Sequence, residues 1–136
     1  MLVALALGGA GALANGVKLL SGKTRPYVLQ PDPPPLVRPH VDLTLPSGHA
    51  ATSFAAALVL SLLVRRAPAT AAFFALALAI AWSRVYVGVH YPSDVVLGAI
   101  LGFGVGGATF VLAPRIRALR RPGAALRRSR REPPAG

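Results

Sequence analysis

The stretch "VVLGAILGFGVGGATFVLA", residues 95–113, decides the fold class of this chain. It has 19 residues and no charged side chain, close to the roughly 20 apolar residues that a helix needs to cross a bilayer. Gly98, Gly102 and Gly106 recur every four residues, so they lie on one face of a helix. Small residues at that spacing let a second backbone approach closely within a membrane. The stretch therefore predicts a spanning helix that packs through its glycine face.

Three further apolar stretches precede it, at residues 1–17, 50–64 and 67–82. The middle two are short for a span unless flanking residues complete them, and a soluble bundle with buried helices is the alternative. The first also resembles a secretory signal peptide, although it lacks the basic start of one. We expect an all-α integral membrane bundle of about four spanning helices. Their predicted bounds are about 1–20, 47–65, 67–84 and 92–113.

The rest of the sequence predicts a membrane-embedded domain, residues 1–113, followed by a tail, residues 114–136. Seven prolines between Pro26 and Pro46 predict an extended loop, because proline lacks the N–H that a helix needs. This Pro-rich loop, 26–46, is expected to cover one end of the bundle. The tail is rich in Arg and ends in "REPPAG", which predicts a partly disordered segment.

The charge of the chain is strongly positive, with 15 Lys and Arg against 4 Asp and Glu and a formal net charge of +11. Much of the excess lies in the tail without a nucleic-acid-binding motif or interleaved aromatics, so we expect no nucleic-acid partner. A basic segment beside a span suits anionic lipid instead. The absence of Cys excludes disulfides, thiolate metal sites and a cysteine nucleophile. The preference for Arg over Lys, with abundant Ala and Gly, indicates a GC-rich bacterial gene.

Polar residues gather at the ends of the predicted helices. In an up-down-up-down bundle, the end of the first helix, the start of the second, the end of the third and the start of the fourth share one membrane face. Polar groups at such a place are functional candidates. They are Lys18, Arg25, Ser47, Gly48, His49, Arg84, His90 and Asp94.

The chemistry of this set points to phosphate, since it combines three cations with two helix N-termini. Ser47 is a suitable N-cap, and Gly48 allows close approach of a ligand. The four acidic residues are spread and unpaired, which argues against a metal cluster or an aspartyl-phosphate pair. A histidine nucleophile remains, because Asp94 lies four residues after His90 and can reach back to its ring, while His49 serves as general acid. No metal or cofactor is expected.

Three segments carry a family resemblance. They are "KLLSGKTRP" at 18–26, "PSGH" at 46–49 and "SRVYVGVHYPSD" at 83–94. Together they resemble the three-part signature of the type 2 phosphatidic acid phosphatase superfamily, which includes lipid phosphate phosphatases and vanadium haloperoxidases. All eleven fixed positions match in order across residues 18–94, and the trio is far more specific than any one segment.

The resemblance implies a phosphohistidine mechanism that needs no metal. It makes His90 the nucleophile, Asp94 the residue that orients it, and His49 the proton donor. The residues implied to bind phosphate are Lys18, Arg25, Ser47, Gly48 and Arg84. Membrane members usually have six spanning helices, with two before the Lys-bearing one. The chain is therefore expected to be a reduced or N-terminally truncated version of that fold.

The expected function is hydrolysis of a phosphate monoester or diphosphate on a membrane lipid or polyprenyl carrier. The alternatives are a phosphotransferase or vanadate-dependent peroxidase using the same pocket, or a non-catalytic polybasic protein that binds acidic lipid. Basic residues are more numerous on the side of the tail, so we expect a cell-membrane protein with a cytoplasmic tail and an extracytoplasmic active site. Lys23 falls outside the signature and is predicted to lie at the rim.

Overall fold

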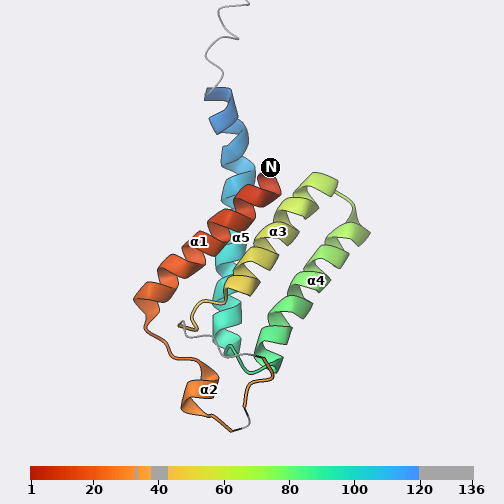
Figure 1. Cartoon of the computed structure of the whole chain (residues 1–136). Coiled ribbons are helices and arrows are strands. Elements are labelled where there is room, and N and C mark those ends of the chain that lie inside the picture. Colours follow the sequence, from red (N-terminus) through yellow and green to blue (C-terminus); the bar gives the residue numbers. More distant parts are fainter. Residues whose placement is uncertain (33, 38–42, 120–136) are drawn as a thin grey trace, which may run out of the picture.

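The chain folds into four long helices and one short helical turn, seen in a computed structural model that describes residues 1–32, 34–37 and 43–119. The helices are α1 (Leu2–Ser21), α2 (Pro26–Leu29), α3 (Gly48–Val64), α4 (Ala67–Tyr86) and α5 (Pro92–Leu119). Those described ranges contain no strand. The predicted all-α bundle is therefore confirmed (Figure 1).

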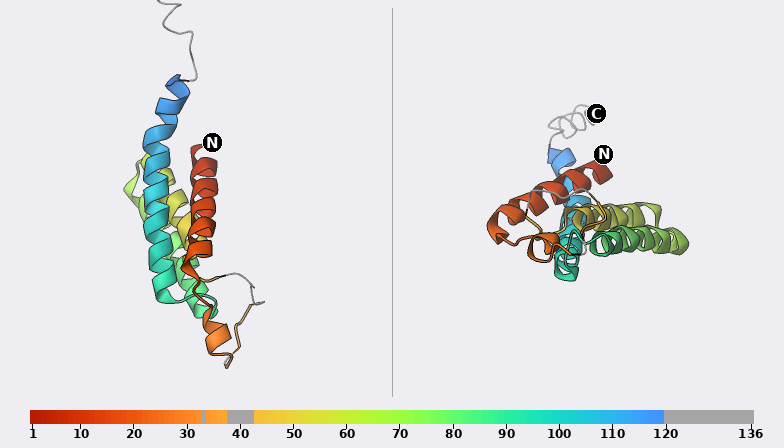
Figure 2. Two further views of the ribbon diagram at one scale, coloured as in Figure 1. Left: turned by 90° about the vertical axis from the view of Figure 1, so that its left-hand side faces the viewer. Right: turned by 60° about the horizontal axis from the view of Figure 1, so that its bottom comes forward.

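The central helix is α3, which packs against α1, α4 and α5. Within the part of the chain that the structure describes, no Cα atom of α1 lies within 8 Å of one in α4, so the two helices flank α3 on separate sides. Two views in Figure 2 show α5 running along the bundle beside α1. Most of the buried side chains are small, which brings the helices close together. The cluster between α1 and α3 consists of Ala6, Ala10, Ala14, Ala51, Ala55 and Val59.

The predicted glycine face of α5 is confirmed, and it lies against the backbone of α3. A methyl group added at Gly98 would come 2.5 Å from the Ser47 carbonyl oxygen. At Gly102 it would collide with the Ala51 carbonyl oxygen, and at Gly106 it would lie 3.0 Å from the Ala55 carbonyl oxygen, one turn further along α3. At these three glycines the backbone of α5 therefore lies directly against the backbone of α3, with no α5 side chain between them.

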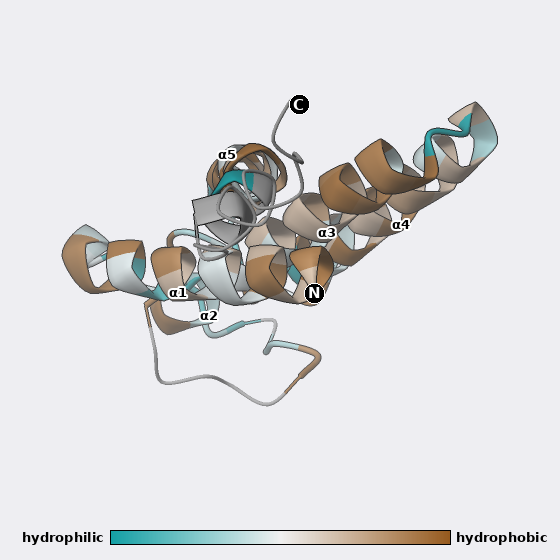
Figure 3. Cartoon of the chain, turned by 90° about the horizontal axis from the view of Figure 1, so that it is seen from above, coloured by the Kyte–Doolittle hydropathy of each residue, from teal (hydrophilic) through white to brown (hydrophobic). Residues whose placement is uncertain are grey.

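Among the described residues, three segments are long and apolar enough to cross a membrane: Leu2–Leu29, Ala67–Tyr86 and Pro92–Ala113. The helix α3 is also apolar but has only 17 residues. Figure 3 shows hydrophobic residues along the length of the helices and hydrophilic ones where α3 joins α4. Many large apolar side chains point outward, as expected where lipid replaces water. Examples are Leu5, Leu13, Leu76, Leu78, Val96, Ile100 and Phe103.

Two boundaries differ from the prediction. The Pro-rich loop contains the turn α2, because Pro26 stands at its first position, where a missing N–H costs no hydrogen bond. The last helix continues from Ala113 through Pro114 to Leu119, as membrane helices tolerate the loss of one backbone hydrogen bond at proline. Residues 120–136, most of the predicted tail, lie outside the described residues.

Candidate functional site

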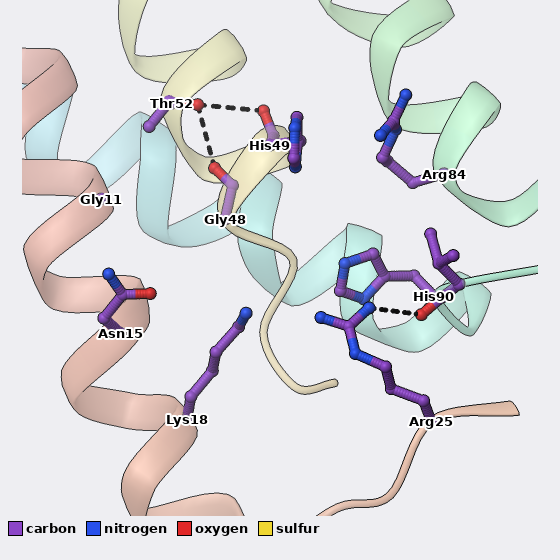
Figure 4. A pocket seen from close by; sticks show the side chains of 10 residues that line it. Gly11, Asn15, Lys18, Arg25, Gly48, His49, Thr52, Arg84 and His90 are labelled. Carbon is purple, nitrogen blue, oxygen red and sulfur yellow. Dashed lines mark hydrogen bonds between the residues drawn. The ribbon is translucent and has the colours of Figure 1, made fainter. Parts of the chain in front are cut away.

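The predicted convergence of helix ends is confirmed at the end of the bundle that carries α2. A cavity of about 400 Å³ opens there between α1, α3 and the α4–α5 connection (Figure 4). Six of the eight candidate residues line it, while Ser47 and Asp94 lie behind its wall. The lining residues are Gly11, Asn15, Lys18, Arg25, Gly48, His49, Thr52, Arg84, Val89 and His90.

The three cations reach the cavity from three different elements. Lys18 is in the last turn of α1, Arg84 is in the last turn of α4, and Arg25 immediately precedes α2. Arg25 is only 3% exposed, and its guanidinium donates a hydrogen bond of 2.9 Å to the Val89 carbonyl. Among the ten residues of the described chain that line the cavity, none is acidic. The cavity therefore favours an anion.

The start of α3 forms another wall of the cavity. Ser47 is the N-cap of this helix, and its hydroxyl accepts a hydrogen bond of 3.5 Å from the Ala50 N–H. The Ser47 side chain is fully buried, so its contribution to the cavity is to hold the helix start in place. Gly48 lines the cavity, and a side chain there would meet no atom within 4 Å. The helix N-terminus can thus be approached by an anion.

His90 lies in the connection between α4 and α5 and is 5% exposed. This connection turns at Gly88, whose φ of 76° is a conformation that favours glycine. The backbone N–H of His90 then donates a hydrogen bond of 3.2 Å to the Arg84 carbonyl. The turn brings the nucleophile candidate and one of the cations to the same wall of the cavity.

Asp94 is fully buried in the first turn of α5 and accepts three hydrogen bonds. Its Oδ1 atom receives one of 2.7 Å from Lys23 Nζ, and its Oδ2 atom receives one of 2.8 Å from the Tyr91 N–H. The third comes from the Thr44 hydroxyl, 2.5 Å from Oδ2. Bonds to charged donors and to backbone N–H stabilise a carboxylate. Asp94 is thus held as an anion behind His90.

The contact between His90 and Asp94 is indirect. The Nδ1 atom of His90 lies 3.6 Å from Asp94 Oδ2, longer than an ordinary hydrogen bond. The Thr44 hydroxyl lies 3.1 Å from the same Nδ1 atom and also bonds to the carboxylate. The sequence predicted that Asp94 reaches back to the ring, and the structure places Thr44 between them.

Two residues of this network were missed by the sequence interpretation. Lys23 was predicted to lie at the rim outside the signature, and it forms the ion pair with Asp94. Thr44 was not singled out, because it lies in the loop before α3 where no periodicity distinguishes one polar residue from another. The one available signal was its position in the sequence. Thr44 lies five residues before His49, so the chain at Thr44 is close to the site.

The pKa of His90 is lowered from its ordinary value to about 4. Burial is the largest cause, followed by the positive charge of Arg25, while Asp94 acts in the opposite direction. The imidazole is consequently neutral near neutral pH, and a lone pair on one ring nitrogen is available for reaction.

His49, in contrast, is exposed in the first turn of α3. The neighbouring Thr52 hydroxyl is bonded to the backbone of this turn, at 2.9 Å from the Gly48 carbonyl and 3.3 Å from the His49 carbonyl (Figure 4). The site therefore contains one buried and one exposed imidazole.

A second cavity, of about 240 Å³, lies between α1, α3 and α4. It is lined mainly by apolar side chains, among them Leu7, Leu60 and Phe73. Thr52 lines both cavities. The polar site thus adjoins an apolar groove on the flank of the bundle, where α1 and α4 do not meet.

An all-helical bundle with a cationic cavity and a buried His–Thr–Asp network defines a class of membrane protein with an anion-binding site. The chain belongs to the PAP2 superfamily, whose family model matches residues 1–118. The resemblance noted in the sequence is confirmed by this match, and the chain is a membrane protein.

Three similar proteins illustrate the relationship. A decaprenylphosphoryl-5-phosphoribose phosphatase of Mycobacterium tuberculosis is 38% identical over 101 residues, covering 71% of this chain and 51% of that protein. The crystal structure of LpxE from Aquifex aeolicus has a TM-score of 0.74 and 32% identity, covering 80% of this chain and 65% of that one. The transmembrane PAP2-type phosphatidylglycerolphosphate phosphatase of Bacillus subtilis has a TM-score of 0.70 and 27% identity, covering 85% and 59%. The chain thus spans about half to two thirds of the length of these proteins.

Proposed function

We propose that this protein is a phosphatase that hydrolyses a phosphate monoester or diphosphate on a membrane lipid or polyprenyl carrier. The observation that carries the proposal is a neutral, buried His90 at a cavity lined by Lys18, Arg25 and Arg84. Cations bind the phosphate and stabilise charge in its transition state, while a neutral imidazole supplies the electron pair for attack. Membership of the PAP2 superfamily supports the same chemistry.

In the first proposed step, the Nε2 atom of His90 attacks phosphorus and the bond to the leaving oxygen breaks. His49 donates a proton to that oxygen as general acid. In the second step, His49 takes a proton from water, the water oxygen attacks phosphorus, and the phosphorus–nitrogen bond breaks. Inorganic phosphate leaves and His90 returns to its starting form.

The charges developed in both steps are met by groups of this chain. We assign phosphate binding to Lys18, Arg25 and Arg84, together with the α3 N-terminus at Ser47 and Gly48. Arg84 and Arg25 offer planar forks that can bind two phosphate oxygens each. None of the proposed steps requires a metal ion, so EDTA should leave the rate unchanged. Orthovanadate, which adopts five-coordinate geometry, should inhibit.

The membrane setting supports a lipid as the substrate. The apolar groove at Leu7, Leu60 and Phe73 adjoins the cationic cavity through Thr52. A molecule with a phosphate at one end and a hydrocarbon chain at the other matches this succession of surfaces. A lipid phosphate can occupy both surfaces, whereas a small soluble phosphate ester can occupy the cationic cavity alone.

We further propose that the cavity faces the outside of the cytoplasmic membrane. Arg65 and Arg66 lie at the opposite end of the bundle, and eight more Arg residues follow residue 114. Cytoplasmic ends of spanning helices carry the excess of Lys and Arg. Because the chain has no Cys, single cysteines at Gln30 and Ala67 can be tested with an impermeant thiol reagent on cells. Labelling at position 67 and not at 30 would reverse the orientation.

The activity is tested by incubating purified protein with phosphatidate, phosphatidylglycerophosphate, undecaprenyl diphosphate and a phosphorylated polyprenyl sugar, and measuring released phosphate. We expect release from at least one lipid, unchanged by EDTA and absent in His90→Gln. Binding of acidic vesicles without phosphate release would favour the polybasic lipid-binding alternative. Equal release by His90→Gln would overturn the mechanism.

A further inference from the structure

The Thr44 hydroxyl occupies a place that the family signature does not assign. Thr44 is fully buried, and its oxygen lies 2.5 Å from Asp94 Oδ2 and 3.1 Å from His90 Nδ1. Its backbone N–H donates a hydrogen bond of 2.9 Å to the Lys23 carbonyl. This bond fixes the loop that carries the hydroxyl. The side chain therefore has a defined position between the two catalytic candidates.

The direction of these two hydrogen bonds follows from the groups that make them. A hydroxyl has one proton, and a carboxylate can only accept. Thr44 therefore donates to Asp94 and has lone pairs left for His90. The imidazole must then donate, so the ring proton is on Nδ1 and the lone pair is on Nε2. This tautomer is the one that a nucleophile acting through Nε2 requires.

Both carboxylate oxygens of Asp94 have hydrogen-bond partners other than His90. Lys23 Nζ lies 2.7 Å from Oδ1 and also 4.4 Å from the centre of the Tyr91 ring. The Tyr91 N–H and the Thr44 hydroxyl both donate hydrogen bonds to Oδ2. With these partners, the carboxylate cannot rotate towards His90 without losing bonds, and Thr44 is the group that connects the two.

We propose that Thr44 is a positioning residue that selects the Nδ1–H tautomer of His90 and transmits the orientation set by Asp94. The part of this inference that concerns rate rests on the proposed function, in which His90 attacks phosphorus. The part that concerns the tautomer does not, because it depends only on the hydrogen bonds within the folded protein.

The informative variants are Thr44→Val, which keeps the shape and removes the hydroxyl, and Thr44→Ser, which keeps the hydroxyl. Thr70→Val is the matched control, since Thr70 lies at the opposite end of the bundle in the first turn of α4. We expect kcat of Thr44→Val to fall roughly ten- to hundredfold, by analogy with the loss of a group that orients a metal-bound histidine. KM should change less than about twofold, because the cations that bind phosphate are untouched.

The second readout is nitrogen NMR of protein labelled at histidine, recorded in micelles at neutral pH, with the His90 signals identified by their loss in His90→Gln. The charged groups acting on His90 are Arg25, Lys18 and Asp94, and Arg84 lines the same cavity. None of them is changed in the Thr44 variants. Wild type, Thr44→Ser and Thr70→Val should show the Nδ1–H tautomer, and Thr44→Val should show a mixture.

A mixed tautomer together with a reduced kcat in Thr44→Val, both restored in Thr44→Ser, supports the proposal. An unchanged tautomer, an unchanged kcat, or a failure of Thr44→Ser to restore either one overturns it. If Thr44→Val does not fold, as judged by circular dichroism, the same comparison is made with Thr44→Ala. If no lipid is hydrolysed by wild type, the proposed function fails, and the NMR result alone still decides whether Thr44 sets the tautomer.

Discussion

His90 and His49 line the same cavity but lie in opposite surroundings. His90 is 5% exposed, in a short connection, with Thr44 and Asp94 behind its ring. His49 is exposed in the first turn of α3, where the Thr52 hydroxyl donates hydrogen bonds to the Gly48 and His49 carbonyls. One residue type is thus used in two ways, because burial and neighbouring charges decide what an imidazole does.

The difference corresponds to the two tasks of the proposed reaction. A nucleophile needs a fixed direction and a free electron pair, which burial, the Nδ1 contact and a lowered pKa supply. A group that gives a proton and later takes one needs access to water, which exposure supplies. The surroundings of the two histidines therefore support the roles proposed for them.

The largest expected effect comes from replacing each histidine by Gln and measuring nitrophenolate release from para-nitrophenyl phosphate. His90→Gln should give no release above background, because no other nucleophile is available in the proposed mechanism. His49→Gln should give a burst of about one equivalent followed by turnover slowed about 10²–10⁴-fold. A good leaving group needs no proton in the first step, whereas water in the second step still needs a base. A burst in His90→Gln, or its absence in His49→Gln, would break the assignment.

The second largest effect is expected on the stability of the fold, through the close packing of α3 against α5. Gly98→Ala places a methyl group 2.5 Å from the Ser47 carbonyl, so α3, which carries His49, must shift against α5, which carries Asp94. We expect the stability to drop by about 1–3 kcal/mol, as for other overpacked contacts. Gly104→Ala is the matched control on the same helix, since no atom lies within 4 Å of the added methyl group.

Thermal unfolding in detergent measures both variants. Gly104→Ala should unfold at the same temperature as wild type or slightly higher, because alanine is the better helix former. Similar unfolding temperatures for Gly98→Ala and Gly104→Ala would show that the close approach of α3 and α5 does not limit stability.

The smallest expected effect is on pH dependence. The neutral form of His90 is the reactive one, so protonation inactivates it, and kcat/KM should fall as the pH drops through about 4 rather than through the ordinary value of 6.5. Arg25 lowers this pKa, so Arg25→Gln should raise it and move the acid limb upwards. A histidine NMR titration measures the pKa directly. A wild-type value near 6.5 would mean that burial does not separate His90 from His49.

Much of the site was predictable because its residues stand at helix ends. Apolar runs locate the helices, and in an up-down-up-down bundle the ends that carry Lys18, His49, Arg84 and His90 lie on one face. The glycine spacing likewise predicted the packing face of α5, since Gly98, Gly102 and Gly106 fall on one face, but it did not identify α3 as the partner.

Other features depend on information that periodicity does not contain. Thr44 belongs to an irregular loop, and its register against α5 is set by pairing with Lys23. Lys23 itself is one of two lysines five residues apart, and only the folded chain shows which one faces Asp94. The turn α2 can form because Pro26 stands at its first position. The number of prolines in the loop does not show this, because it ignores where each proline stands.

The short length of α3 has a consequence for the surrounding lipid. At 17 residues it extends about 25 Å, less than the hydrocarbon core of about 30 Å. With Ser47 at one end and Arg65 at the other, both ends cannot reach the two surfaces of an ordinary bilayer at once. A short span is accommodated by local thinning of the membrane, by flanking side chains such as Arg65 that reach up to the surface, or by a cavity floor that sits below the plane of the head groups. In each case the thickness of the host membrane helps to set the depth at which His49 and His90 meet a phosphate.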